Sequence, residues 1–129
     1  MKKVITFGTF DLFHIGHLNI LKRAAELGDY LIVGVSTDKL NYSKKGRNPI
    51  YCQKSRAEII SSMACVDAVF FEESLEKKRE YILFHNADIL VMGDDWVGKF
   101  DEFNDICEVV YLERTPSIST TEIIEIIKE

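Results

Sequence analysis

Two histidines near the start of the chain are the side chains best suited to chemistry. The segment from Gly8 to His17 reads GTFDLFHIGH, and His14 and His17 stand where a predicted strand passes into a predicted helix. A helix N-terminus offers unpaired N–H groups and about half a positive charge, which favours a bound phosphate. Gly8 and Gly16 would let the backbone approach that phosphate. The imidazoles can donate hydrogen bonds to it and can be cationic near neutral pH, which suits a phosphate that gains charge in a transition state.

Two other interpretations of this turn stay open. The histidines, together with Thr9 and Asp11, could serve only to cap and pack the helix. They could also bind zinc with His85, although His85 lies at a predicted helix end and no cysteine cluster completes a ligand set. We therefore assign no metal-ligating residues.

Further charged groups lie in the middle of the chain. We predict an irregular segment over 41–51, where Lys44, Lys45 and Arg47 form a local basic cluster in an acidic protein. Lys78 lies in the run EKKRE, which by itself is typical of an exposed helix face. Asp94 and the next residue, also an aspartate, could bind a metal or hold a loop in place. Each of these groups thus has a structural alternative to a role in binding.

These groups must be positioned by alternating strands and helices. Short apolar runs predict strands, and periodic segments predict helices. The strands are expected over 4–7, 30–36, 66–71, 89–92 and 108–112, and the helices over 18–27, 53–63, 75–85 and 120–128. This order is typical of an α/β fold, and we predict a Rossmann-like, doubly wound, mostly parallel five-stranded sheet with helices on both faces, in a single domain over 1–129.

Two helix ends have recognisable signals. Gly28 stands where the first helix would end in a left-handed residue. Ser119, with Glu122 three residues later, is typical of a capping box that opens the last helix.

Composition limits the classes of partner. The chain has 129 residues and a net charge of −5, so we expect neither a nucleic-acid partner nor an anionic membrane surface. No stretch approaches the ~20 apolar residues of a membrane span. Three cysteines without a CxxC pair favour neither a disulfide framework nor a zinc site, so a reducing cytoplasm is the expected location.

Three motifs resemble those of one enzyme family. The GTFDLFHIGH turn resembles the HxGH signature of the nucleotidyltransferase superfamily, in the wording of its cytidylyltransferase branch. The segment RTPSISTT over 114–121 resembles the branch's RTxGISTT element before the last helix. The segment VMGDDWVGKFD over 91–101 is similar to that of glycerol-3-phosphate cytidylyltransferases. The resemblance extends over essentially the whole chain.

The resemblance implies a reaction and its substrates. Members of the branch join CTP to a phosphorylated alcohol by direct attack of its phosphate on the α-phosphorus, and pyrophosphate leaves. Such a reaction mainly needs alignment and neutralisation of charge. For this chain the resemblance implies sn-glycerol 3-phosphate as the second substrate, CDP-glycerol as the product, Mg²⁺ on the triphosphate, a homodimer, and a place in teichoic acid or capsule synthesis.

The resemblance also implies residue roles. The catalytic residues would be His14, His17, Lys44 and Arg114. Lys44, Lys78 and Arg56 would contact the phosphorylated alcohol. The CTP-binding residues would be Thr9, Phe10, His14, Gly16, His17, Arg114, Thr115, Ile118, Ser119, Thr120 and Thr121, whereas Asp11 would orient the turn.

The chain departs from the family pattern near the alcohol end. Ser117 stands in place of a glycine and Leu75 in place of a tryptophan, and the loop with Lys45 and Arg47 has one residue more than the pattern. The choice of alcohol therefore stays open among glycerol 3-phosphate, phosphoethanolamine, phosphocholine and ribitol phosphate, as does a related transferase that uses ATP. A non-catalytic module that binds a nucleotide is the alternative outside the enzyme class.

Overall fold

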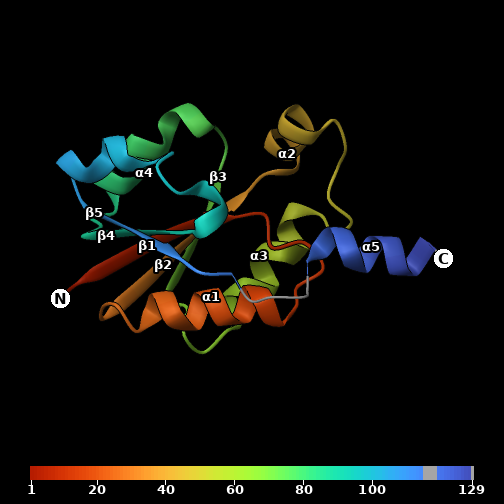
Figure 1. Cartoon of the computed structure of the whole chain (residues 1–129), viewed down its shortest axis with the longest axis horizontal. Coiled ribbons are helices and arrows are strands. Elements are labelled where there is room, and N and C mark those ends of the chain that lie inside the picture. The colour runs from red at the N-terminus through yellow and green to blue at the C-terminus, as the bar shows by residue number, and fades with distance from the viewer. Residues whose placement is uncertain (115–118, 129) are drawn as a thin grey trace.

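The protein folds around one parallel sheet of five strands, seen in a computed structural model that describes residues 1–114 and 119–128 (Figure 1). The strands are β1 (Lys3–Gly8), β2 (Tyr30–Ser36), β3 (Ala68–Glu72), β4 (Ile89–Gly93) and β5 (Glu108–Leu112). They lie in the order β3-β2-β1-β4-β5, and every neighbouring pair is parallel.

The strand order reverses at β1, which pairs with β2 on one side and with β4 on the other. In open α/β sheets, ligands bind at the carboxyl ends of the strands beside such a switch point. Gly8 ends β1 and Gly93 ends β4, so the predicted histidine turn begins at this place.

Helices cover both faces of the sheet, as Figure 1 shows. On one face α1 (Ile15–Ala25) and α3 (Gln53–Ser61) bury Leu21 and Ile60 against the strands. On the other face α4 (Lys78–Phe84) buries Ile82, and a 3₁₀ helix over Asp101–Asp105 buries Phe103. The predicted Rossmann-like α/β fold with a parallel five-stranded sheet is therefore confirmed.

Part of the segment predicted to be irregular over 41–51 is helical. Its first five residues belong to a helix, α2 (Asp38–Lys45). The hydroxyl of Thr37 accepts a hydrogen bond from the Leu40 amide and so caps the helix N-terminus. Gly46 ends it in the left-handed conformation with φ of 73°. The sequence interpretation missed this helix because its cap lies before the basic cluster.

Gly28 does not have the expected left-handed conformation, because positive φ among the described glycines is confined to Gly46 and Gly98. A Cβ atom at Gly28 would lie 2.7 Å from the Lys2 carbonyl oxygen and from the Val4 side chain. Glycine is needed there for close packing against the start of β1.

Several elements differ in their bounds from the prediction, among them the first helix, which was expected over 18–27 and covers Ile15–Ala25. The helix expected over 75–85 begins as a 3₁₀ turn over Leu75–Lys77 before α4, and a further 3₁₀ turn covers Asp94–Trp96 after β4. The strand expected over 66–71 is found as β3, which begins two residues later and ends one residue later. The last helix, α5 (Thr120–Lys128), lies where predicted, and the Ser119 hydroxyl accepts a hydrogen bond from the Glu122 amide.

Among the described helices, none is both long enough and apolar enough to pass through a bilayer.

Candidate active site

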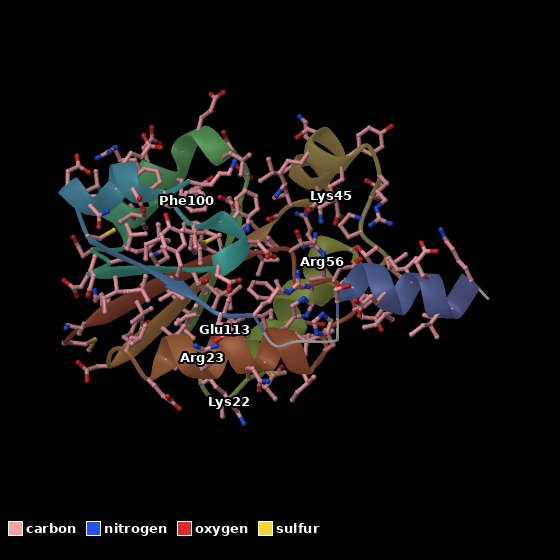
Figure 2. All side chains as sticks on the ribbon, viewed as in Figure 1. Lys22, Arg23, Lys45, Arg56, Phe100 and Glu113 are labelled. Atoms are coloured by element: carbon pink, nitrogen blue, oxygen red, sulfur yellow. The ribbon has the colours of Figure 1, made fainter. Side chains whose placement is uncertain are left out.

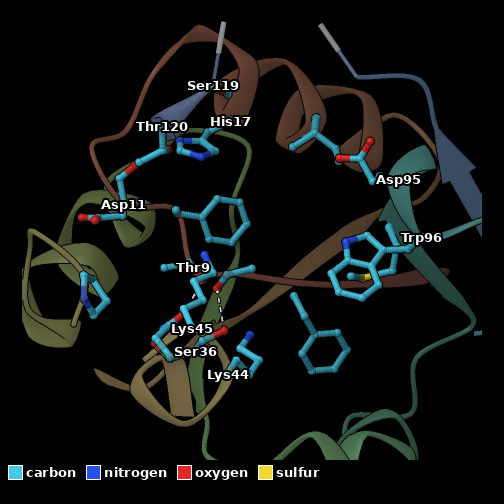
Figure 3. Close-up of a pocket in the computed structure, with 18 of the residues that line it drawn as sticks. Thr9, Asp11, His17, Ser36, Lys44, Lys45, Asp95, Trp96, Ser119 and Thr120 are labelled. Atoms are coloured by element: carbon cyan, nitrogen blue, oxygen red, sulfur yellow. Dashed lines mark hydrogen bonds between the residues drawn. The ribbon is translucent and has the colours of Figure 1, made fainter. Parts of the chain in front are cut away.

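A cleft of about 740 Å³ opens at the carboxyl ends of the strands (Figure 3). The described site residues predicted from the sequence all line it except Arg56. They are Thr9, Phe10, His14, Gly16, His17, Lys44, Lys78, Arg114, Ser119, Thr120 and Thr121. The turn after β1 and the start of α5, more than a hundred residues apart in the chain, therefore share one cavity. Thr115 and Ile118, like Ser117, lie outside the described residues.

The turn between β1 and α1 has an unusual backbone. Phe10 and Leu12 have positive φ angles of 55° and 48°, which non-glycine residues rarely adopt. A Cβ atom at Gly8 would lie 2.8 Å from the Phe10 ring. Gly8 is therefore needed so that this ring can fold back into the core, where it contacts His17 edge-on with 5.5 Å between centroids. Backbone strain of this kind is concentrated at functional sites.

Both imidazoles are held by the backbone through the same ring atom. The His14 Nδ1 accepts a hydrogen bond from the Gly16 amide, and the His17 Nδ1 accepts one from the His14 amide. An Nδ1 that accepts a hydrogen bond carries no proton, so the neutral ring holds its proton on Nε2. The rings stack with 3.8 Å between centroids, and the buried His14 Nε2 has no partner among the described residues. The His14 Nε2–H is thus left to donate to a ligand.

The expectation that these histidines can be cationic near neutral pH is not met. Burial is the main cause that lowers the pKa of His17 from 6.5 to about 4, and the neighbouring His14 is the second cause. Burial and the nearby Arg114 lower the pKa of His14. A proton on either Nδ1 would also break the capping hydrogen bond. The two histidines are therefore neutral in the free protein.

The tautomer and the low pKa of His17 can be measured together. In long-range ¹H–¹⁵N spectra of the imidazoles, we expect His17 to hold its proton on Nε2 at pH 7 and to titrate far below 6.5, near pH 4.

Between pH 4 and pH 6.5 the unfolded state binds more protons at His17 than the folded state. The contribution of His17 to stability is therefore present above pH 6.5 and is lost as the pH falls towards 4. Urea unfolding of His17→Gln should show a shallower fall over this interval. A His17 midpoint at 6.5 would contradict the assignment.

Asp11 orients the turn, as expected from the sequence. Its carboxylate accepts hydrogen bonds from the amides of Ile50 and Tyr51, at 2.6 and 2.8 Å. Its carbonyl accepts a hydrogen bond of 2.9 Å from the hydroxyl of Thr120, the first residue of α5. One residue thus joins the histidine turn to two distant segments, and Figure 3 shows Asp11, His17 and Thr120 together at one side of the cleft.

Arg114 reaches the same cleft from the end of β5. Its guanidinium contacts the Asp95 carboxylate at 3.3 Å, and both side chains are more than half exposed. The backbone beside it is anchored, because the Glu113 carbonyl accepts a hydrogen bond from Arg23 of α1 (Figure 2). The exposed pair leaves the Arg114 cation available to an anion in the cleft.

Arg56 lies in the interior and not in the cleft where the resemblance implied a substrate contact (Figure 2). Its guanidinium donates to three carbonyl oxygens and to the Asp38 carboxylate, at 2.7 to 2.9 Å. The carbonyls belong to Thr9, Ser36 and Tyr51. Arg56 therefore positions the segments around the site.

Two lysines lie at the other side of the cleft. Lys44 is placed on α2, and Figure 3 shows it across the cavity from His17. Burial lowers the pKa of Lys44, and the nearby Glu72 partly opposes this shift. Lys78 contacts the Glu72 carboxylate at 2.7 Å and is almost fully buried. Lys44 thus offers a cation to a ligand, whereas the Lys78 cation already has a partner.

Two residues that line the cleft, Asn41 and Glu72, escaped the sequence interpretation. Asn41 of α2 is buried, and its Oδ1 accepts a hydrogen bond of 2.7 Å from the Thr9 hydroxyl. Glu72 ends β3 inside the cleft. The signal for Asn41 was its spacing of four residues from the helix cap Thr37. The only sequence signal for Glu72 was its position as a charged residue at the end of an apolar strand.

The described residues contain no group of three or more histidine, cysteine or acidic side chains arranged to hold a metal ion. Asp95 lines the cleft, but its carboxylate contacts Arg114.

Comparison with known proteins agrees with this geometry. The sequence model of the cytidylyltransferase-like family matches residues 5–126. The chain belongs to that family. Within it, the chain is 52% identical to the glycerol-3-phosphate cytidylyltransferase of Bacillus subtilis (strain 168), over 97% of this chain and 96% of that protein. It is 46% identical to the glycerol-3-phosphate cytidylyltransferase of Staphylococcus aureus (strain NCTC 8325 / PS 47), over 95% and 92%.

A solved structure also has a fold similar to that of this chain. The lipopolysaccharide core biosynthesis protein from Thermoplasma volcanium GSS1 superposes with a TM-score of 0.77, at 26% identity, over 89% of this chain and 98% of that one. The family resemblance expected from the three motifs is confirmed.

Proposed function

We propose that this protein is an enzyme that joins CTP to sn-glycerol 3-phosphate, giving CDP-glycerol and pyrophosphate. The observation that carries the proposal is the cleft that the histidine turn and α5 share. The Thr120 hydroxyl donates a hydrogen bond to the Asp11 carbonyl, and this contact holds the start of α5 beside the histidine turn. The identity of 46–52% to two proteins named glycerol-3-phosphate cytidylyltransferase supports the choice of substrates.

In this proposal the cleft binds the triphosphate between two anion-binding corners. His14 and His17 donate from Nε2 to oxygens of the α-phosphate, where negative charge grows as the attacking phosphate approaches. Arg114 and the N-terminus of α5, which lies beside the histidine turn, bind the other phosphate groups. An oxygen of glycerol 3-phosphate forms a bond to the α-phosphorus, and the bond to the pyrophosphate oxygen breaks. No side chain needs to become a nucleophile, because the attacking phosphate is already ionised.

Mg²⁺ would enter with the nucleotide as part of the substrate. Magnesium in proteins is commonly bound by substrate phosphates, several waters and one or two carboxylates. In this proposal Asp95 would assist, since its exposed carboxylate lines the cleft. In this proposal the ion neutralises the triphosphate.

A pyrophosphate-release assay tests the proposed reaction. CTP and ATP are each combined with glycerol 3-phosphate, phosphoethanolamine, phosphocholine and ribitol 5-phosphate, with and without Mg²⁺. The expected result is rapid release with CTP, glycerol 3-phosphate and Mg²⁺ together. Rapid release with another alcohol or with ATP would overturn the choice of substrate, and no release in any combination would overturn the enzymatic proposal.

Lys44 is expected to bind the phosphate of glycerol 3-phosphate. Lys44→Ala should raise the KM for glycerol 3-phosphate by about tenfold or more, because a charge-assisted hydrogen bond contributes about 1.5–3 kcal/mol. The KM for CTP should change little. The matched control is Lys39→Ala on the same helix, an exposed lysine outside the cleft lining. A change confined to the CTP dependence would show that Lys44 serves the nucleotide.

The biological setting forms part of the same proposal. CDP-glycerol would supply glycerol phosphate units for teichoic acid or capsule polymers, and the enzyme would work in the cytoplasm as a homodimer. The three free cysteines support a reducing compartment. Sedimentation of the purified protein tests the dimer.

A further inference from the structure

Asn41 of α2 has both ends of its side-chain amide hydrogen-bonded inside the protein, and the residue is only 1% exposed. Its Nδ2 donates to the carbonyl oxygens of Ser36 and Thr37, at 3.4 and 3.0 Å. Its Oδ1 accepts a hydrogen bond of 2.7 Å from the Thr9 hydroxyl. Because carbonyl oxygens only accept hydrogen bonds, the amide nitrogen must face them, and the amide oxygen is thereby directed at Thr9.

This network fixes the direction of the Thr9 hydroxyl proton. A threonine hydroxyl has one proton, and here that proton is donated to Asn41. The oxygens of an ionised phosphate only accept hydrogen bonds, so the Thr9 hydroxyl has no proton to give to the triphosphate. Its side chain is therefore a contact with α2, and any contact between Thr9 and a phosphate is left to its backbone amide.

The Thr9–Asn41 hydrogen bond joins the two halves of the cleft. Thr9 lies in the histidine turn, which we assign to CTP. Asn41 lies three residues before Lys44, which we assign to the phosphate of glycerol 3-phosphate, and residues three apart in a helix lie on the same face. All three residues line the cleft, and in the view of Figure 3 Thr9 lies between His17 and Lys44. The position of Lys44 relative to the histidine turn therefore depends on this contact.

A second contact connects the same two elements. Arg56 donates to the Thr9 carbonyl at 2.9 Å and to the carboxylate of Asp38, the first residue of α2, at 2.7 Å. Arg56 therefore keeps α2 attached if the side chain of Asn41 is removed. The helix should then shift rather than unfold, and a displacement of about 1 Å caused by a residue outside the chemistry can cost about 10²-fold in rate.

We propose that Asn41 is a positioning residue that aligns the two substrates. Through the Thr9 hydroxyl it holds the helix that carries Lys44 at the distance from the histidine turn at which the attacking phosphate meets the α-phosphorus. This inference rests on the proposed function and adds a residue to its site. In this role Asn41 acts through Thr9 and contacts neither substrate, so it controls the rate within the bound complex.

Truncation of either partner should lower kcat. Asn41→Ala should reduce kcat by about 10-fold to 100-fold, because the substrates still bind but are misaligned. Thr9→Val removes the hydroxyl, keeps the shape of the side chain, and should reduce kcat equally. The KM values for CTP and glycerol 3-phosphate should change little in both variants. Pyrophosphate release with each substrate varied in turn measures these constants.

Two further variants show whether the pair acts as one unit. The double variant of Thr9→Val and Asn41→Ala should be no slower than either single variant, since the effects of residues that act together are not additive. Thr9→Ser keeps the hydroxyl and should restore nearly normal kcat. If Asn41→Ala does not fold, Thr9→Val and Thr9→Ser decide the question.

The matched control is Thr6→Val in β1. The buried Thr6 hydroxyl donates a hydrogen bond of 2.7 Å to the Val91 carbonyl, so this variant also removes a buried hydroxyl and its hydrogen bond. Thr6→Val and Thr9→Val should both lower the free energy of unfolding in urea, but only Thr9→Val should lower kcat. This difference separates positioning from a contribution to stability alone.

Three outcomes would overturn the inference. One is a folded Asn41→Ala or Thr9→Val with kcat near that of the wild-type protein. Another is an equal fall of kcat in Thr6→Val. The third is a raised KM for CTP at unchanged kcat in Thr9→Val, which would show that the hydroxyl binds the nucleotide. Absence of pyrophosphate release by the wild-type protein would instead overturn the proposed function, so the two failures are distinguishable.

Discussion

The His17→Ala variant is expected to form CDP-glycerol about 10²-fold to 10³-fold more slowly than the wild-type protein, which is the usual loss when one donor to a developing negative charge is removed. The loss should fall on kcat more than on the KM for CTP, because the hydrogen bond strengthens as charge grows on the α-phosphate. Single-turnover rates with saturating CTP and glycerol 3-phosphate measure it.

Two controls make this result specific to the cleft. His85→Ala removes a histidine that packs on Phe70 at the end of α4, outside the cleft lining, and should keep nearly normal turnover. Circular dichroism and urea unfolding establish that His17→Ala is folded, since His17 also accepts a hydrogen bond from the His14 amide. Near-normal turnover in a folded His17→Ala would remove His17 from the mechanism.

The Arg56→Ala variant is expected to lower the free energy of unfolding by about 3–5 kcal/mol, because four hydrogen bonds from a buried cation are lost and three carbonyl acceptors are left without a donor, at about 1–3 kcal/mol for each unsatisfied group. The side chain of Arg56 is 0% exposed, and four acceptors lose their donor together. Urea denaturation measures the change, with the same dependence of the unfolding free energy on urea concentration used for the variant and the wild-type protein. A loss of this size is a large fraction of the total stability of a small domain.

A control on the same helix isolates this effect. Lys54 of α3 is exposed, and Lys54→Ala should change the free energy of unfolding by less than about 0.5 kcal/mol. Arg56→Lys keeps the charge but presents fewer donors, so its stability should lie between those of Arg56→Ala and the wild-type protein. If Arg56→Ala unfolds within about 1 kcal/mol of the wild-type protein, the hydrogen bonds of Arg56 are replaced by water and its positioning role is wrong.

The sequence was sufficient to predict the strands, most of the helices and the turn that carries the histidines. Short apolar runs such as the one in β1 predict a covered parallel strand, because a strand packed on both faces has apolar side chains on both. The Ser119 hydroxyl caps α5 as the local pattern indicated. Such features depend on residues a few positions apart, so they can be found by reading along the chain.

Local patterns failed where distant segments impose the conformation. Gly28 has the spacing of a helix-ending residue, but the strand start packed against it decides its role. Arg56 has the appearance of a substrate-binding cation, yet its partners come from three other segments and enclose it. Lys78 lies in a charged run typical of an exposed helix face, whereas Glu72 and two aromatic rings bury it. The contacts of these three residues cannot be predicted from spacing along the sequence.

The sequence alone thus determined the type of fold and the two segments that we propose to bind phosphate. Only the tertiary structure decided that these segments share one cleft, that the two histidines are neutral, and that Lys78 is paired with Glu72. The physical reason is that burial and opposite charge act through space. The charge state and availability of a side chain therefore depend on neighbours that the chain brings together only when it folds.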